Sequence, residues 1–293
     1  MSDTHRPHGA VTSGATRPRR RSGSGRSAAA RRLGPMPSRW WIGLHGVDPE
    51  RVSLPQLHAA FSRWFDDSIA EHRAIVKPYS LSPPCVDERG VGIEAGLLTE
   101  RAVAQLRRGA HRRERLRLGP CRVEISSLEQ LERATWRELA RYSGARSWEV
   151  HFLTPTSFRQ GRRRSPWPAP PTLLHSVRTS WDAFSPVELD VLAMSDTRHL
   201  WVSDLGGRSE RVRLGREDVV GFVGRLRIEA DCRRVASIAD ALLRLAPYSG
   251  VGSGKTKGLG VVSTTTRAVR PSSVRRGSSR DVVSVGATPP SST

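Results

Sequence analysis

An order of apolar patterns that occurs twice along this chain constrains its fold more than any other feature of the sequence. Each series runs strand, helix, strand, strand, helix, strand, as judged from apolar periodicity. The first series lies at Trp40–Leu44, Leu54–Glu71, Pro78–Ser82, Val91–Leu98, Thr99–Arg108 and Cys121–Ser126. The second lies at Trp148–Thr154, Thr172–Phe184, His199–Leu205, Val219–Glu229, Arg234–Ala246 and Leu259–Thr265. Because this is the order of a ferredoxin-like βαββαβ unit, the sequence predicts two such units in tandem.

The two series divide the chain into two predicted domains of the α+β class. We expect an N-terminal ferredoxin-like domain over residues 36–147 and a C-terminal one over residues 148–266. The flanking segments, 1–35 and 267–293, are rich in Arg, Gly and Ser and poor in large apolar groups, which predicts disordered basic termini. Ferredoxin-like domains of the RRM type present a sheet face to RNA. The fold class therefore favours RNA as a ligand.

The net charge supports a polyanionic partner. At pH 7 the chain carries a formal charge of +20, and each phosphate that a basic side chain neutralises adds salt-sensitive affinity. Only three of the 48 basic residues are lysines, namely Lys77, Lys255 and Lys257. In a chain that otherwise uses arginine, the positions of these lysines are informative.

Composition also limits the compartment and the kind of site. The three cysteines are far apart and form no CxxC pair, which predicts neither a disulfide framework nor a zinc site. The sequence contains no signal-peptide pattern and no apolar run of about 18 residues. We therefore expect a cytoplasmic protein that has no membrane partner and binds no metal.

A glycine-rich stretch near the C-terminal end, YSGVGSGKTKGLGVV from Tyr248 to Val262, contains the letters GSGKT of an ATPase phosphate loop. Such a loop reads GxxxxGK[ST] and lies between a strand and the helix that follows it. Here the predicted order is reversed, with a helix before the loop and a strand after it. Ser249 also stands where the motif begins with glycine. An ATPase is therefore disfavoured.

The same stretch fits a second pattern, in which two GxG pairs flank a basic centre. Glycines let the backbone approach a phosphate closely, and lysines add charge without base preference. This loop, together with the stretches EVHFLTPTSFR, TSWDAFSP and GFVGRLRIEA, resembles the Cas6 family of CRISPR-associated repeat-processing endoribonucleases in the RAMP superfamily. The resemblance implies RNA binding by Gly250, Gly252, Lys255, Lys257, Gly258 and Gly260.

The activity that this resemblance implies is the cleavage of precursor CRISPR RNA within its repeats to give crRNA. RNA carries its own nucleophile, the 2′-hydroxyl, so scission needs a base, an acid for the leaving 5′-oxygen and a cation for the developing phosphorane charge. The expected products are a 2′,3′-cyclic phosphate and a 5′-hydroxyl. We expect no metal and no other cofactor.

One histidine stands out among the nine because of its setting, SIAEHRAIVKPYSLSPP. His72 lies at the end of the first predicted helix, and Lys77 follows five residues later, just before a strand. The family resemblance implies that His72 is the general acid or base and that Lys77 stabilises the phosphorane charge. His58 and His45 remain alternatives for the catalytic histidine.

A second function is compatible with the same features. The loop and the basic charge would also serve a non-catalytic RNA-binding RAMP subunit of a CRISPR effector complex, in which no proton transfer is needed. The family resemblance further implies subunits of such a complex, or a second copy of the chain in a homodimer, as possible partners. Only His72 and Lys77 separate the two functions at the level of sequence.

Overall fold

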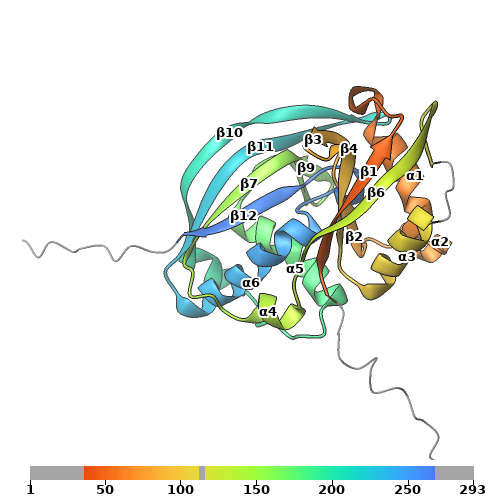
Figure 1. The fold of residues 1–293 in the computed structure, drawn as a ribbon. Helices are drawn as coiled ribbons and strands as arrows, with labels where there is room; N and C mark the ends of the chain where they lie inside the picture. The colour runs from red at the N-terminus through yellow and green to blue at the C-terminus, as the bar shows by residue number, and fades with distance from the viewer. Residues whose placement is uncertain (1–35, 112–115, 268–293) are drawn as a thin grey trace, which may run out of the picture. The chain divides into compact units, whose positions relative to one another are not determined.

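Two antiparallel sheets, one from each half of the chain, organise the fold (Figure 1). The computed structural model describes residues 36–111 and 116–267. The terminal segments for which disorder is predicted, 1–35 and 267–293, lie outside the described residues except for Arg267, which ends a strand. Within the described ranges, no helix combines the length and the apolar character needed to cross a bilayer.

The first sheet has the strand order β2-β4-β1-β6-β5, and β3 pairs with β4 at its side. Its strands are β1 (Ser38–His45), β2 (Tyr79–Leu81), β3 (Cys85–Asp87), β4 (Gly90–Leu97), β5 (Leu116–Leu118) and β6 (Cys121–Arg133). In the run β6-β1-β4-β2, the first strand lies between the last and the third, as in a ferredoxin-like unit. The predicted fold is confirmed for this half.

Two helices, α1 (Leu54–Phe65) and α3 (Glu100–His111), contact each other and contribute to the core of this half. Alternate residues of β1 point to one face of the sheet, and Trp40 and Ile42 share a buried cluster with Leu57 and Phe61 of α1. The core of this half therefore forms where the apolar face of the helix, with its period of 3.6 residues, meets the apolar face of the strand, with its period of 2 residues.

The predicted helix Leu54–Glu71 is wrong in one respect, because the structure has two helices in its place. The first helix, α1, ends at Phe65, and a short helix α2 (Ile69–Arg73) begins after Ser68. The Ser68 hydroxyl accepts a hydrogen bond from the Glu71 N–H and caps α2. Asp and Ser bond to nearby backbone groups more readily than they continue a helix, which explains the break at residues 66–68.

The second sheet has the order β10-β11-β7-β12, again with the first strand between the last and the third. Its strands are β7 (Ser147–Thr156), β10 (Leu200–Leu214), β11 (Glu217–Ala230) and β12 (Val262–Arg267). Helices α5 (Pro170–Phe184) and α6 (Arg233–Ser249) contact each other and share one buried cluster with the sheet. Tandem ferredoxin-like architecture is thus confirmed.

Several elements of the structure lie outside the two predicted series. The hairpin of β10 and β11 pairs from Leu200↔Ala230 to Leu214↔Glu217, and β10 extends well beyond Leu205, where the predicted strand ends, while β11 is close to its predicted range. The short strands β3 and β5 of the first sheet are also additions. The others are a small hairpin, one short α-helix and three 3-10 turns: β8 (Phe158–Gln160), β9 (Arg163–Ser165), α4 (Trp136–Ala140), η1 (Pro49–Arg51), η2 (Met194–His199) and η3 (Lys255–Lys257).

Helix α6 connects the two halves, because it contacts strands of both sheets (Figure 1). At its C-terminal end, the Tyr248 carbonyl accepts a hydrogen bond from the Ser80 hydroxyl of β2 at 3.1 Å. A Cβ atom on Gly96 of β4 would lie only 2.0 Å from that carbonyl oxygen, so this contact requires glycine. The glycine-rich loop that follows α6 is thereby placed beside the first half of the chain.

Candidate functional site

His72 lies on α2, and its ring is held at one nitrogen. Its Nδ1 is 3.0 Å from Oδ2 of Asp66, the residue that follows α1. A carboxylate can only accept, so Nδ1 carries the proton and donates it. For Nε2 the described residues supply no hydrogen-bond partner, and 57% of the side chain is exposed. The ring therefore presents Nε2 to solvent in a fixed orientation.

Lys77 shares the same carboxylate. Its ammonium lies 2.8 Å from the other oxygen of Asp66 and also donates to the Glu71 carbonyl of α2. The exposed fractions of the Lys77 and Asp66 side chains are only 12% and 4%. The structure thus brings the two predicted catalytic residues together through a buried aspartate. This geometry favours a positioning role for Lys77, since its charge is already paired.

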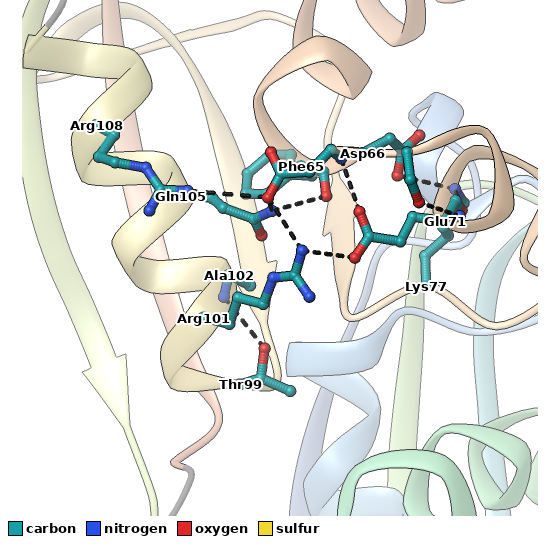
Figure 2. Close-up of polar contacts among 11 residues, drawn as sticks. Phe65, Asp66, Glu71, Lys77, Thr99, Arg101, Ala102, Gln105 and Arg108 are labelled. Carbon is teal, nitrogen blue, oxygen red and sulfur yellow. Dashed lines mark hydrogen bonds and ion pairs between the residues drawn. The ribbon is translucent and has the colours of Figure 1, made fainter.

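A set of ion pairs ties the segment around α2 to α3, as Figure 2 shows. The Arg101 guanidinium lies 3.0 Å from Asp67 and 2.6 Å from Glu71. The Gln105 amide donates to the Phe65 carbonyl at 3.0 Å and to Asp67 at 2.9 Å. Hydrogen bonds from Arg101 and then from Gln105 lower the pKa of Asp67. These contacts hold α2, and with it His72, against α3.

His58, an alternative candidate, lies on α1 and faces His72. The two rings are stacked with centroids 6.1 Å apart and planes inclined by 25°. His58 Nδ1 is 3.2 Å from the carbonyl oxygen of Thr256 in the glycine-rich loop. Burial lowers the pKa of His58 below its ordinary value, and the nearby positive charge of Lys257 acts in the same direction. The loop, α1 and α2 therefore meet at these two histidines.

The glycines of the loop have a structural reason that sequence spacing alone does not give. The four glycines of the two GxG pairs, Gly250, Gly252, Gly258 and Gly260, have positive φ angles between 66° and 86°, and Gly254 between them has a φ of 80°. The Val251 N–H donates a hydrogen bond of 2.8 Å to the Gly260 carbonyl, which holds the two ends of the loop together. At this close approach, a Cβ atom on Gly260 would lie only 1.9 Å from the Val251 carbonyl oxygen. Only glycine permits this fold of the loop.

The two lysines of the loop point to different surroundings. The Lys255 ammonium donates to the Ser180 hydroxyl of α5 at 2.9 Å, and burial lowers its pKa to about 8. Lys257, in contrast, lies near enough to His58 for its charge to affect that ring. Direct RNA contact stays a prediction for both, but the geometry favours Lys257 as the phosphate contact and Lys255 as an internal anchor of the loop.

Replacing Lys255 by methionine is expected to stabilise the folded protein near pH 7 by roughly 1 kcal/mol, or about 2–4 °C in Tm. The folded pKa of about 8 lies below the ordinary value of 10.5. The unfolded chain therefore binds more protons between these values, and the stability that wild type gains as pH rises from 8 to 10.5 should vanish in the variant. Thermal melts across this pH range test the prediction. A lower Tm for the variant at pH 7 would contradict it.

His45 lies apart from this group of residues. It lines a hollow at the end of β1 together with Asp48, Arg51 and Arg89, and neither His58 nor His72 lines that hollow. Sequence reasoning also missed two residues that the structure places at the site, Asp66 and Thr256. Asp66 had a signal, because the Asp-Asp-Ser run at residues 66–68 is a poor helix interior. Thr256 contributes only its backbone carbonyl, so nothing in the sequence pointed to it.

Comparison with known proteins gives one family and several similar folds. Residues 150–262 match the family model described as CRISPR-associated endoribonuclease Cas6. This match includes the glycine-rich loop and does not reach α1 or α2. Among curated proteins, none matches the chain.

Two solved structures illustrate the similarity of fold. The product complex of Cas6 (TTHA0078) has a TM-score of 0.69 and 24% identity, over 78% of this chain and 99% of that one. The product complex of Cas6 (TTHB231) from Thermus thermophilus has a TM-score of 0.67 and 22% identity, over 79% of this chain and 100% of that one. At such identities the likeness establishes the fold alone.

Proposed function

We propose that this chain, which belongs to the Cas6 family of CRISPR-associated endoribonucleases through its C-terminal domain, cleaves precursor CRISPR RNA within its repeats. Membership rests on the family match over residues 150–262, and endoribonuclease is the activity that the family's description names. The proposal extends to the mechanism. Cleavage uses the 2′-hydroxyl of the RNA, requires no metal ion and leaves a 2′,3′-cyclic phosphate and a 5′-hydroxyl.

The observation that carries the mechanism is the contact between the glycine-rich loop and the histidines of the N-terminal half. A loop that contacts the RNA backbone through Lys257 would place a phosphate beside His58 and His72, because the Thr256 carbonyl contacts His58. Histidine suits proton transfer near neutral pH, and a lysine suits the developing negative charge of the phosphorane. A fixed ring at His72 supplies the orientation that proton transfer needs.

Cleavage of a repeat RNA in EDTA is the experiment that tests this proposal. We expect full activity in EDTA, because each required proton transfer is assigned to a side chain of the protein. A substrate with a 2′-deoxy sugar at the scissile position should bind and remain uncut, since it lacks the nucleophile. The products should carry a cyclic phosphate. Activity that requires a divalent ion, or scission of the 2′-deoxy substrate, would overturn the mechanism.

A second candidate function is a non-catalytic RNA-binding RAMP subunit of a CRISPR effector complex. The fold also resembles a structure described as a RAMP protein that binds different RNA substrates, with a TM-score of 0.52 and 11% identity over 78% of this chain and 99% of that one. Tight binding of repeat RNA without cleavage under any ionic condition would favour this function. Effector subunits and a second copy of the chain remain proposed partners, which copurification and light scattering would test.

A further inference from the structure

We propose that Ser176 and Ser180 of α5, together with Lys255, are positioning residues that hold the tip of the glycine-rich loop in place for cleavage. The tip is the 3-10 turn η3, Lys255–Lys257. This inference rests on the proposed function and deepens it, because it concerns how the loop keeps its position beside the RNA. It also gives the lysine of the GSGKT letters, which an ATPase would use to bind phosphate, a contact inside the protein.

The two serines lie on the face of α5 that contacts the loop. They are four residues apart, so their hydroxyls lie one helical turn from each other on the same side of the helix. The Ser176 oxygen accepts the Gly252 N–H at 3.1 Å, and its own proton goes to the Leu173 carbonyl at 2.8 Å. The Ser180 oxygen accepts a hydrogen bond from the Lys255 ammonium at 2.9 Å. One turn of α5 therefore holds the loop at two points, before its tip and within it.

The side chain of Lys255 crosses the loop to make its contact with α5. A Cβ atom on Gly250 would lie 3.3 Å from both Cγ and Cδ of Lys255, so the stem of the lysine passes close to the Gly250 backbone. Gly250 directly follows α6, and Ser180 lies on α5. The lysine thus joins three segments, namely the start of the loop, its tip and α5.

The burial of this ammonium costs stability, which argues against a purely structural role. Desolvation lowers the pKa of Lys255 to about 8. Among the described residues, the ammonium has the neutral Ser180 hydroxyl as its partner and forms no ion pair with a carboxylate. A buried charge without an opposite charge is costly. Residues that break such a local rule concentrate at functional sites.

The position of the tip matters because the tip contacts the N-terminal half of the chain. The turn η3 contacts α1 and β2, and the Thr256 carbonyl lies 3.2 Å from His58 Nδ1. The charge of Lys257, at the end of the tip, reaches the same ring. A shift of the tip would move Lys257 relative to a bound phosphate, and a misplacement of about 1 Å can cost about 10²-fold in rate.

The salt dependence of RNA binding separates a positioning lysine from one that binds phosphate. Each neutralised phosphate contributes about 0.7–0.9 to the slope of log Kd against log salt concentration. The probe is repeat RNA with a 2′-deoxy sugar at the scissile position. We expect Lys255→Met to keep the wild-type slope and to bind within about threefold of wild type, whereas Lys257→Met should lose about 0.7–0.9 of the slope. An equal loss of slope in both variants would show that Lys255 binds a phosphate, and would overturn the proposal.

Single-turnover cleavage with saturating enzyme measures the positioning effect itself. We expect Lys255→Met to cut about 10–100-fold more slowly than wild type, although its Tm at pH 7 is no lower. Ser180→Ala should slow cleavage in the wild-type protein and add no further loss to Lys255→Met, because the two residues act through one contact. Thr179→Ala is the control and should cut at the wild-type rate, since the Thr179 hydroxyl bonds to the Ser176 carbonyl of its own helix.

Each result of these measurements bears on the proposal. A wild-type rate for Lys255→Met, or losses that multiply when Ser180→Ala is combined with it, would overturn the positioning role and leave the endoribonuclease intact. If Ser180→Ala fails to fold, the double variant, which has no ammonium to leave unpaired, still gives the comparison with Lys255→Met. Failure of the wild-type protein to cut repeat RNA would instead overturn the proposed function, and the salt slopes would still show whether Lys255 contacts RNA.

Discussion

His72→Ala lowers the rate of repeat-RNA cleavage by about 10²–10⁴-fold and leaves RNA affinity within about threefold of wild type. The rate falls because positioned proton transfer contributes this much to catalysis. Affinity is retained because the side chain is 57% exposed and, among the described residues, makes its one side-chain hydrogen bond to Asp66. Single-turnover cleavage measures the first quantity, and titration of the 2′-deoxy substrate measures the second.

The control for this variant replaces another histidine whose Nδ1 contacts an aspartate, as in the His72–Asp66 pair, but which lies far from the glycine-rich loop in sequence. His199 contacts Asp231 at 2.7 Å on the opposite half of the chain. His199→Ala should therefore cleave at the wild-type rate. A full rate for His72→Ala would transfer the catalytic role to another histidine, and an equal loss of affinity and rate would make His72 a binding residue.

Asp66→Ala is expected to have the second large effect, because this carboxylate serves both His72 and Lys77. Removing one partner of a buried ion pair leaves an uncompensated charge, which costs about 3–5 kcal/mol. Here Lys77 would be left with an ammonium that is only 12% exposed. His72 would lose its orientation as well, so the cleavage rate should fall at temperatures where the variant is still folded. Urea unfolding and single-turnover kinetics measure the two effects.

A double variant separates stability from catalysis at this position. Asp66→Ala with Lys77→Met removes both charges, and an apolar replacement of a buried pair is often neutral or stabilising. We expect the double variant to regain most of the lost stability and to remain impaired in cleavage. Asp231→Ala is the matched control, since it removes an exposed carboxylate from a partly buried histidine and should change stability by at most about 1 kcal/mol. Recovery of cleavage in the double variant would show that Asp66 only balances Lys77.

Much of the fold followed from local pattern. The apolar periods located most of the ferredoxin-like strands and helices, including α6, whose apolar residues Val235, Ile238 and Leu242 are all buried. The length of the β10–β11 hairpin was not predictable in this way. Beyond Leu205, β10 carries mainly charged and glycine residues, and its pairing depends on the partner strand β11 rather than on an apolar face of its own.

The candidate site likewise combines features that the sequence predicted with contacts that only the structure revealed. The sequence was enough to single out the four glycines of the two GxG pairs, the order helix, loop, strand around them, and His72 with Lys77. Each of these features depends only on residues that are close together along the chain. The sequence alone also disfavoured an ATPase, because the GSGKT letters follow a predicted helix and precede a predicted strand, and the structure confirms that the loop joins α6 to β12.

Tertiary structure alone decided which of these residues meet. It paired His58 with His72, inserted Asp66 between His72 and Lys77, and turned Lys255 inward to Ser180. Each contact joins elements distant in sequence or depends on the bend between two short helices. Burial, the direction of a side chain and the charge beside a ring are properties of such contacts, so no pattern along the chain records them.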